Sequence, residues 1–321
     1  MKLLAKIALV FAASFSMLGT AAAQNWPTKP IKLVVPFGPG GSTDITARLL
    51  AQELTILLGQ SVVVDNRGGG GGNIGAAIVA RSEPDGYTLM MATSTHVTNP
   101  GLYKDMTYDV LKDFAFVSQV AFIPNMLVVT KDLPVKNLAE FVDYVRQNKG
   151  PVYYGSSGSG TSQHLAAALF NTMANGKMEH IPYKGGGAAA VDLMAGRIQA
   201  YFAPLAEVVP RIDSGSVLAI AATTKERVSR YPNIPTVGEA LPGYEVALWN
   251  GIFAPAKTPP EIVNKLSTAI QQILKKPEMQ KKLAEQGSTP VGSSPEEFAK
   301  FVASELPKWV RIAKMSGATV N

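Results

Sequence analysis

Glycine-rich loops that also carry hydroxyl side chains are the segments of this chain best suited to bind a ligand. The first loop, Pro36-Phe-Gly-Pro-Gly-Gly-Ser-Thr-Asp44, joins an apolar β-branched segment to one with helical spacing. Loops at the carboxyl ends of strands are where open α/β sheets bind ligands. Free backbone N–H groups and about half a positive charge at the helix start favour an anion. The alternative, a tight turn that only caps the helix, stays open.

Two further glycine loops follow in the second half of the chain. Gly155-Ser-Ser-Gly-Ser-Gly-Thr-Ser-Gln-His164 has the same order of small residues, hydroxyls and a helix start. Facing the first loop, it would hold a carboxylate with neutral donors, at roughly 1.5–3 kcal/mol per bond. We expect His164 to form structural hydrogen bonds rather than to act in catalysis. In Tyr183-Lys-Gly-Gly-Gly187, Lys184 either contacts the ligand or is solvated.

Alternating strand and helix patterns place these loops. Strands are predicted over 31–36, 61–65, 87–92, 126–130, 152–155, 180–183, 198–203, 217–222 and 245–254. Helices are predicted over 45–58, 76–81, 137–147, 161–174, 188–195, 259–275, 277–286 and 295–314. This order predicts an α/β fold with a mostly parallel sheet, in two halves with a cleft between them. The second half begins near Asn125.

Several enzymatic and cofactor sites are excluded or poorly supported. With no Cys, the chain has no disulfide, zinc finger, iron–sulfur cluster or thiol nucleophile. Gly70-x-Gly72-x-x-Gly75 fits the dinucleotide fingerprint, but the next strand lacks the acidic residue that would hold a ribose. Only three His are present, so we predict neither a metal site nor a cofactor. A hydrolase using Ser157 and His164 stays open, although no third group is apparent.

The N-terminal segment and the charge indicate a secreted protein. Residues 1–23 have a basic start, an apolar run of about 12 residues and a small-x-small ending, which predicts a cleaved signal peptide rather than a membrane anchor. The mature chain would be 24–321, located in the periplasm of a bacterium with two membranes. The net charge is +6, or +4 without Lys2 and Lys6, and no Lys/Arg-rich block occurs. Nucleic-acid binding is therefore disfavoured.

Motifs spread over nearly all the mature chain resemble the Bug family of periplasmic solute receptors, the binding-protein component of tripartite tricarboxylate transporters. The matching stretches are Trp26-Pro-x-Lys-Pro-Ile, Val35-Pro-Phe-Gly-Pro-Gly-Gly-Ser-Thr-Asp44, Val64-Asp-Asn-Arg67, Pro84-Asp-Gly-Tyr-Thr-Leu89, Tyr154-Gly-Ser-x-Gly-x-Gly-x-x-x-His164, His180-x-Pro-Tyr-Lys-Gly185, Asp192-Leu-Met-Ala-Gly196, Pro235-Thr-Val-x-Glu239 and Trp249-x-Gly-x-x-Ala-Pro255. The resemblance implies a type II periplasmic binding protein. Its first lobe would comprise 24–123 and 246–321, and its second lobe 124–245.

The resemblance also implies a function and a set of contacts. A small carboxylic acid (a di- or tricarboxylate or an aromatic acid) would bind between the lobes of a monomeric, non-enzymatic receptor that delivers it to membrane permease subunits. A sensor for a signalling partner is a weaker alternative. Expected ligand contacts are Phe37, Gly40, Gly41, Ser42, Asp44, Thr93, Ser94, Thr95, Ser157, Gly158 and Thr161, with Lys184 and Ala203 as further candidates. Some relatives have an acidic residue after the strand that here ends at Ala203, and its absence argues against an ammonium-bearing ligand.

Overall fold

The computed structural model describes residues 26–147, 149–318 and 320. The predicted signal peptide, 1–23, lies outside the described residues. Within these ranges, no helix is both long enough and apolar enough to cross a membrane.

Helices and strands alternate along most of the chain, as predicted. The strands are β1 (Ile31–Val35), β2 (Val62–Asn66), β3 (Thr88–Thr93), β4 (Phe114–Val129), β5 (Tyr153–Ser156), β6 (Glu179–Pro182), β7 (Ala200–Pro204), β8 (Leu218–Ala222), β9 (Ala247–Pro255) and β10 (Thr289–Pro290). The helices are α3 (Ser42–Leu58), α4 (Asn73–Ala80), α5 (Ser94–Thr98), α6 (Leu138–Arg146), α7 (Ser162–Met173), α8 (Gly186–Met194), α9 (Leu205–Asp213), α10 (Val237–Ala240), α11 (Pro260–Lys275), α12 (Pro277–Glu285) and α13 (Pro295–Ser316). Two short 3₁₀ turns, η1 (Gly70–Gly72) and η2 (Asn99–Gly101), complete the description.

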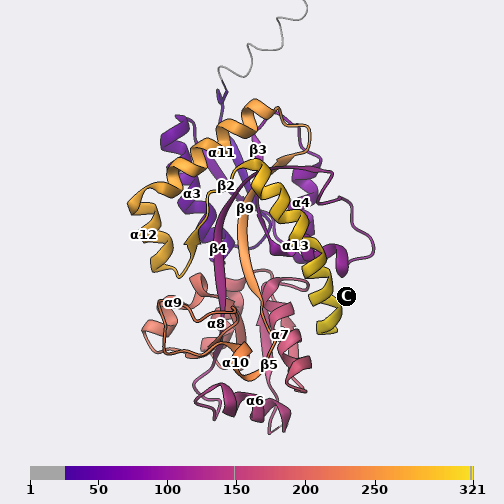
Figure 1. Cartoon of the computed structure of the whole chain (residues 1–321), viewed down its shortest axis with the longest axis vertical. Helices are drawn as coiled ribbons and strands as arrows, with labels where there is room; N and C mark the ends of the chain where they lie inside the picture. Colours follow the sequence, from indigo (N-terminus) through magenta and orange to yellow (C-terminus); the bar gives the residue numbers. More distant parts are fainter. Residues whose placement is uncertain (1–25, 148, 319, 321) are drawn as a thin grey trace, which may run out of the picture.

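Two α/β lobes share the long strand β4, which runs from one to the other (Figure 1). The sheet order is β2-β1-β3-β9-β4-β7-β5-β6, and β8 and β10 also pair with β4. The sheet is mixed rather than mostly parallel as predicted, because β4 and β9 pair antiparallel with all their partners. We call the part with β1–β3, β9, α3–α5 and α11–α13 the first lobe, and the part with β5–β8 and α6–α10 the second lobe.

Strand β4 changes partners where the two lobes meet. Its residues Phe114–Pro124 pair with β9, and Asn125–Val129 pair with β7 and β8. The change falls between residues 124 and 125, one residue from the boundary predicted between 123 and 124. The lobe boundaries stay a prediction.

Two elements at the junction differ from the sequence prediction. Strand β4 begins at Phe114, twelve residues before the predicted start. The prediction started too late because Pro124 resembles a strand break. Proline has no N–H to donate, and here it lies where β4 exchanges one partner strand for others. Helix α9 was not predicted at all, because Pro204 and Pro210 lie only six residues apart. Pro204 precedes the first turn, where proline is compatible with a helix.

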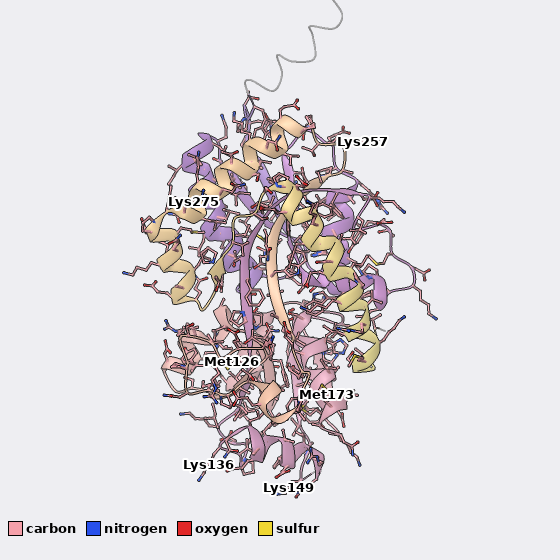
Figure 2. The ribbon with its side chains drawn as sticks, in the orientation of Figure 1. Met126, Lys136, Lys149, Met173, Lys257 and Lys275 are labelled. Carbon is pink, nitrogen blue, oxygen red and sulfur yellow. The ribbon has the colours of Figure 1, made fainter. Side chains whose placement is uncertain are left out.

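One buried apolar cluster extends through both lobes, and each lobe also has a cluster of its own. In the first lobe the β-branched residues of β1 pack against the apolar face of α3, with Leu33 and Leu50 fully buried. In the second lobe Met126 of β4 packs against α8 and α9. Figure 2 shows Lys136 and Lys149 at the outer end of the second lobe and Lys257 and Lys275 on the first, all exposed.

The chain passes between the lobes at two adjacent places that are tied by Thr223. The Thr223 amide donates to the Asn125 carbonyl at 3.0 Å, and the Val246 amide donates to the Thr223 carbonyl at 2.9 Å. Thr223 is fully buried. These contacts therefore hold the two crossings side by side.

Candidate functional site

Three helices and a capped turn begin around one cavity between the lobes. Helices α3, α7 and α8 each start there, after strands β1, β5 and β6 respectively. The short helix α5, capped by the Thr93 hydroxyl, adds Thr93 and Thr95. The lining residues are Phe37, Gly41, Ser42, Thr43, Thr93, Thr95, Ser157, Ser162, Gln163, Gly186, Glu207 and Leu248. Because helix N-termini carry unpaired N–H groups and partial positive charge, the cavity suits an anion.

The predicted contacts divide into three groups. Lining the cavity are Phe37, Gly41, Ser42, Thr93, Thr95 and Ser157. Adjacent in the chain but outside the lining are Gly40, Ser94, Gly158 and Thr161. The third group is Asp44, which follows the lining residue Thr43 but is bonded to its own loop, together with Lys184 and Ala203.

The Asp44 carboxylate stabilises the first loop through hydrogen bonds. Its Oδ2 accepts from the Gly40 amide at 2.9 Å and from Arg48 Nε at 3.0 Å, and its Oδ1 accepts from Asn66 Nδ2 at 3.0 Å. Burial raises the pKa of this carboxyl, but the bonds from Arg48, Gly40 and Asn66 outweigh burial and leave the pKa below its ordinary value. In this arrangement Asp44 positions the loop and does not face the cavity.

Lys184 and Ala203 are not placed to contact a ligand through their side chains. Lys184 is exposed, and its backbone carbonyl accepts from the Gly38 amide at 3.0 Å. Ala203 is fully buried and pairs with Met126 of β4 inside the second lobe.

The lobes touch through their loops, so the cavity is almost closed. Besides the Gly38–Lys184 bond, the Tyr103 hydroxyl donates to the Ser159 carbonyl at 3.1 Å. A Cβ on Gly38 would lie 2.7 Å from the Lys184 oxygen, so glycine is needed for this approach. The cavity has about 10 Å³, the room of roughly one water molecule. A solute can enter only after the loops separate.

Unpartnered polar atoms lie at and beneath this cavity. Among the described residues, Ser162 Oγ, Ser94 Oγ and Asn250 Oδ1 are buried without a hydrogen-bond partner. Ser162 lines the cavity, and Asn250 lies opposite Thr93 in the β3–β9 pair. Buried polar groups are normally bonded to protein or water, so these atoms indicate a site that accommodates polar atoms.

Sequence reasoning missed six residues that line the cavity: Thr43, Ser162, Gln163, Gly186, Glu207 and Leu248. Glu207 is the charged residue among them. It lies in the first turn of α9, with only 4% of its surface exposed. Its Oε1 accepts from the Ser42 amide at 2.8 Å, and its Oε2 accepts from the Tyr201 hydroxyl at 2.6 Å. Burial raises the pKa of Glu207, although the Tyr201 and Ser42 bonds oppose that rise. Glu207 corrects the expectation that no acidic residue follows the strand ending at Ala203, and with it the argument against an ammonium-bearing ligand. Predicting α9 after β7 would have revealed this residue.

The serine and histidine considered for hydrolysis do not form a pair. The Ser157 hydroxyl donates to Gln163 Oε1 at 3.0 Å, and His164 Nδ1 accepts from the Gly160 amide at 3.1 Å. Another pair does form, because Ser156 Oγ and His180 Nε2 are 2.6 Å apart. Ser156 is fully buried and also accepts from the Gly158 amide, so this pair supports the loop.

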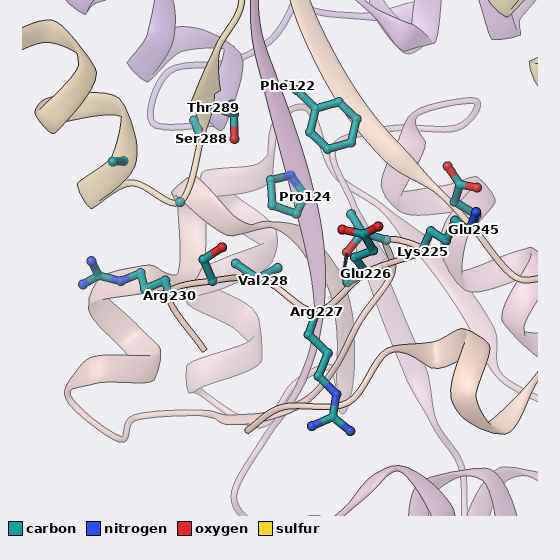
Figure 3. Close-up of a pocket in the computed structure, with 14 residues that line it drawn as sticks. Phe122, Pro124, Lys225, Glu226, Arg227, Val228, Arg230, Glu245, Ser288 and Thr289 are labelled. Atoms are coloured by element: carbon teal, nitrogen blue, oxygen red, sulfur yellow. Dashed lines mark hydrogen bonds between the residues drawn. The ribbon is translucent and has the colours of Figure 1, made fainter. Parts of the chain in front are cut away.

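A larger groove of about 680 Å³ lies at the junction of the lobes, beside β4 (Figure 3). Phe122 and Pro124 form an apolar side, and residues 224–230 form the other. The guanidinium groups of Arg227 and Arg230 are bound to Glu239 and Asp213. Both guanidinium groups of the groove are therefore paired with carboxylates rather than free to bind an anion.

Comparison with known proteins agrees with this architecture. The family described as tripartite tricarboxylate transporter family receptor matches residues 46–318. The structure resembles that of R. palustris Rpa4515 with adipate, at 40% identity, a TM-score of 0.89 and coverage of 92% of this chain and 99% of that one. It also resembles the periplasmic binding protein BugD, at 33% identity and a TM-score of 0.88, with 92% of this chain and 99% of that one covered. A third similar structure is MatC from Rhodopseudomonas palustris with bound malate, at 32% identity and a TM-score of 0.85, with 89% of this chain and 99% of that one covered. The predicted periplasmic binding protein fold is thus confirmed, and the chain belongs to the tripartite tricarboxylate transporter receptor family, whose members are binding proteins rather than enzymes.

Proposed function

We propose that this chain is a periplasmic receptor that binds a small dicarboxylate between its lobes and delivers it to the membrane permease of a tripartite tricarboxylate-type transporter. One observation carries the proposal: the N-termini of α3, α7 and α8 converge on a single cavity lined by hydroxyl groups. Neutral N–H and O–H donors there suit a carboxylate. The adipate and malate named for two relatives are both dicarboxylates, which favours this class over aromatic acids.

The remaining parts of the proposal follow from the family and from the N-terminal sequence. Export would depend on the segment 1–23, cleaved after Ala23, and the mature receptor would act as a monomer. Binding would proceed by closure of the lobes about the two crossings, near Phe122–Pro124 and Val246–Asn250.

Thermal unfolding in the presence of candidate acids tests the ligand class. Adipate, malate, citrate and benzoate are each added to the purified chain. At about 100 times its Kd, a true ligand adds roughly 2.7 kcal/mol to stability, which raises Tm by several degrees. We expect this rise for at least one dicarboxylate. No rise with any acid would contradict the proposed function.

Replacing Gly41 locates the ligand. A Cβ at this position has room, since its nearest neighbour, Glu207 Oε1, lies at 3.4 Å. The two methyl groups of valine, however, would fill the part of the cavity where the N–H and O–H donors converge. We expect Gly41→Val to weaken dicarboxylate binding at least tenfold while stability changes by about 1 kcal/mol or less. Gly41→Ala is the matched control and should retain binding. Equal loss of binding and of Tm in Gly41→Val would count against this site.

A further inference from the structure

Glu207 brings a carboxylate of the second lobe onto the N-terminus of a helix in the first lobe. The bond from the Ser42 amide to Oε1, at 2.8 Å, crosses between the lobes, whereas the Tyr201 hydroxyl that binds Oε2 belongs to the second lobe. The described residues show no salt bridge to this carboxylate, and Arg211 donates only to the Glu207 backbone carbonyl. Glu207 is thus bound by neutral donors, the manner in which the site is proposed to bind the carboxylate of a solute.

The space around Glu207 is matched to its carboxylate. A Cβ on Gly186 would lie 2.2 Å from Oε2, so only glycine permits this position of the side chain. A Cβ on Gly41 would lie 3.4 Å from Oε1. With Glu207 in place, the cavity of about 10 Å³ has no room for a second carboxylate.

Charge leads to the same conclusion as space. Two carboxylates that share a few neutral donors repel each other, so both cannot be bound there as anions. The Ser42 amide is a single donor and can serve one carboxylate at a time.

We propose that Glu207 is an internal competitor of the solute: it binds the Ser42 amide, draws the lobes together, and must be displaced before a solute carboxylate can bind at that amide. This inference rests on the proposed function, because it concerns the same site. It implies that the receptor alternates between a form closed by Glu207 and an open form. The apparent affinity for the solute is then reduced by the fraction of receptor closed in this way.

Removing the Glu207 carboxylate tests the competition. Adipate and malate are titrated by calorimetry into the wild type, Glu207→Ala, Glu207→Gln and the control Glu179→Ala, which alters an exposed glutamate of the second lobe. We expect Glu207→Ala to bind its dicarboxylate about tenfold more tightly, equivalent to 1.4 kcal/mol. Glu207→Gln, which keeps a neutral acceptor, should gain less, and Glu179→Ala should not change. Weaker binding by both Glu207 variants would overturn the proposal, because it would mean that Glu207 contacts the solute.

X-ray scattering of the same proteins without added acid tests closure independently of any solute. Glu207→Ala should have a larger radius of gyration than the wild type. Ser42→Pro is a second variant that leaves Glu207 intact. It removes the amide hydrogen at the first helical position, where proline is well tolerated, and should open the receptor without tightening binding. Unchanged radii in both variants would overturn the proposal.

The two measurements also separate this inference from the proposed function. Failure of every acid to bind any variant would refute the proposed function, and the scattering would still report whether Glu207 closes the lobes. Binding of a dicarboxylate with equal affinity by the wild type and Glu207→Ala would refute the competition alone.

Discussion

Residues of the first loop have two different roles, lining the cavity and supporting the loop, which their residue types alone do not distinguish. Ser42 and Gly41 line the cavity, whereas Asp44, in the same first turn of α3, points its carboxylate back at the loop. Both kinds of residue belong to the same short motif. A contact with a ligand and support for a loop therefore have to be separated by experiment.

Replacing Asp44 makes that separation. We expect Asp44→Ala to lower the free energy of unfolding by roughly 1–3 kcal/mol, because the Gly40 amide and Asn66 Nδ2 lose their shared acceptor. Urea unfolding measures this change. Arg48→Ala removes only a half-exposed ion-pair partner and should cost at most about 1 kcal/mol. Full stability of Asp44→Ala together with lost solute binding would instead make Asp44 a ligand contact.

At the scale of elements, loop contacts between the lobes limit how closely the helix starts approach. Gly38 lies against Lys184 and Gly185, and Gly71 lies against Ser159. A side chain at these positions would hold the loops apart. The glycines at these contacts thus serve closure of the cleft. Gly70, Gly72 and Gly75 instead lie against residues of the first lobe itself.

Gly38→Ala tests this role. Its Cβ would lie 2.7 Å from the Lys184 oxygen in the closed form but meets no such barrier when the lobes separate. We expect solute affinity to fall about tenfold or more, with little change in Tm. The contrasting variant is Gly59→Ala, which lies at a left-handed helix end (φ 69°) with open space around it. That variant should lower stability by roughly 1 kcal/mol and leave binding unchanged.

Most elements were predictable from the sequence, because their periodicity is clear and their ends carry glycine or proline. Strand β1 and helix α11, for example, differ from prediction by one residue at one end. Several glycine and hydroxyl residues that line the cavity, such as Gly41, Ser42 and Ser157, were expected there because they stand between a strand and a helix. The two failures at the junction share one cause: proline inside β4 and α9 resembled a break, and tertiary packing overrode that local signal. The elements α5, α10 and β10 were missed because they are too short to show a residue period. Missing α9 meant missing Glu207, since its place in the cavity depends on a helix turn after β7.

At the scale of the whole molecule, three histidines make stability depend on pH. His96 and His164 are buried and His180 is partly buried, and burial is the main reason why their pKa values fall to about 4, about 3 and about 4. The rings of His164 and His180 are stacked with centroids 3.9 Å apart, which further disfavours charging of His164. All three are therefore neutral in the folded protein.

The folded chain should lose stability as the pH falls below about 6.5. In that range the unfolded state binds more protons at these histidines, so each contributes a loss of up to about 1.4 kcal/mol per pH unit until its folded pKa is reached. Glu207 has a raised pKa, so its contribution to stability increases as the pH falls. That increase offsets the loss from at most one histidine. Urea unfolding at pH 7.5, 6.5 and 5.5 measures the slope. His180→Gln should reduce it, and equal stability at all three values would contradict the prediction.

The position of β9 in the sheet has a consequence for how the chain folds. Strand β3 has β1 on one side and β9 on the other, and β9 also separates it from β4. During synthesis, the sheet that contains β3 can be completed only after Ala247–Pro255 has been made. The strands of the intervening lobe are made before that segment. Pairing between such distant segments is slow because a long loop must first be closed. The intervening lobe should thus reach its native form first, and a ribosome-bound intermediate would expose the apolar edge of β3.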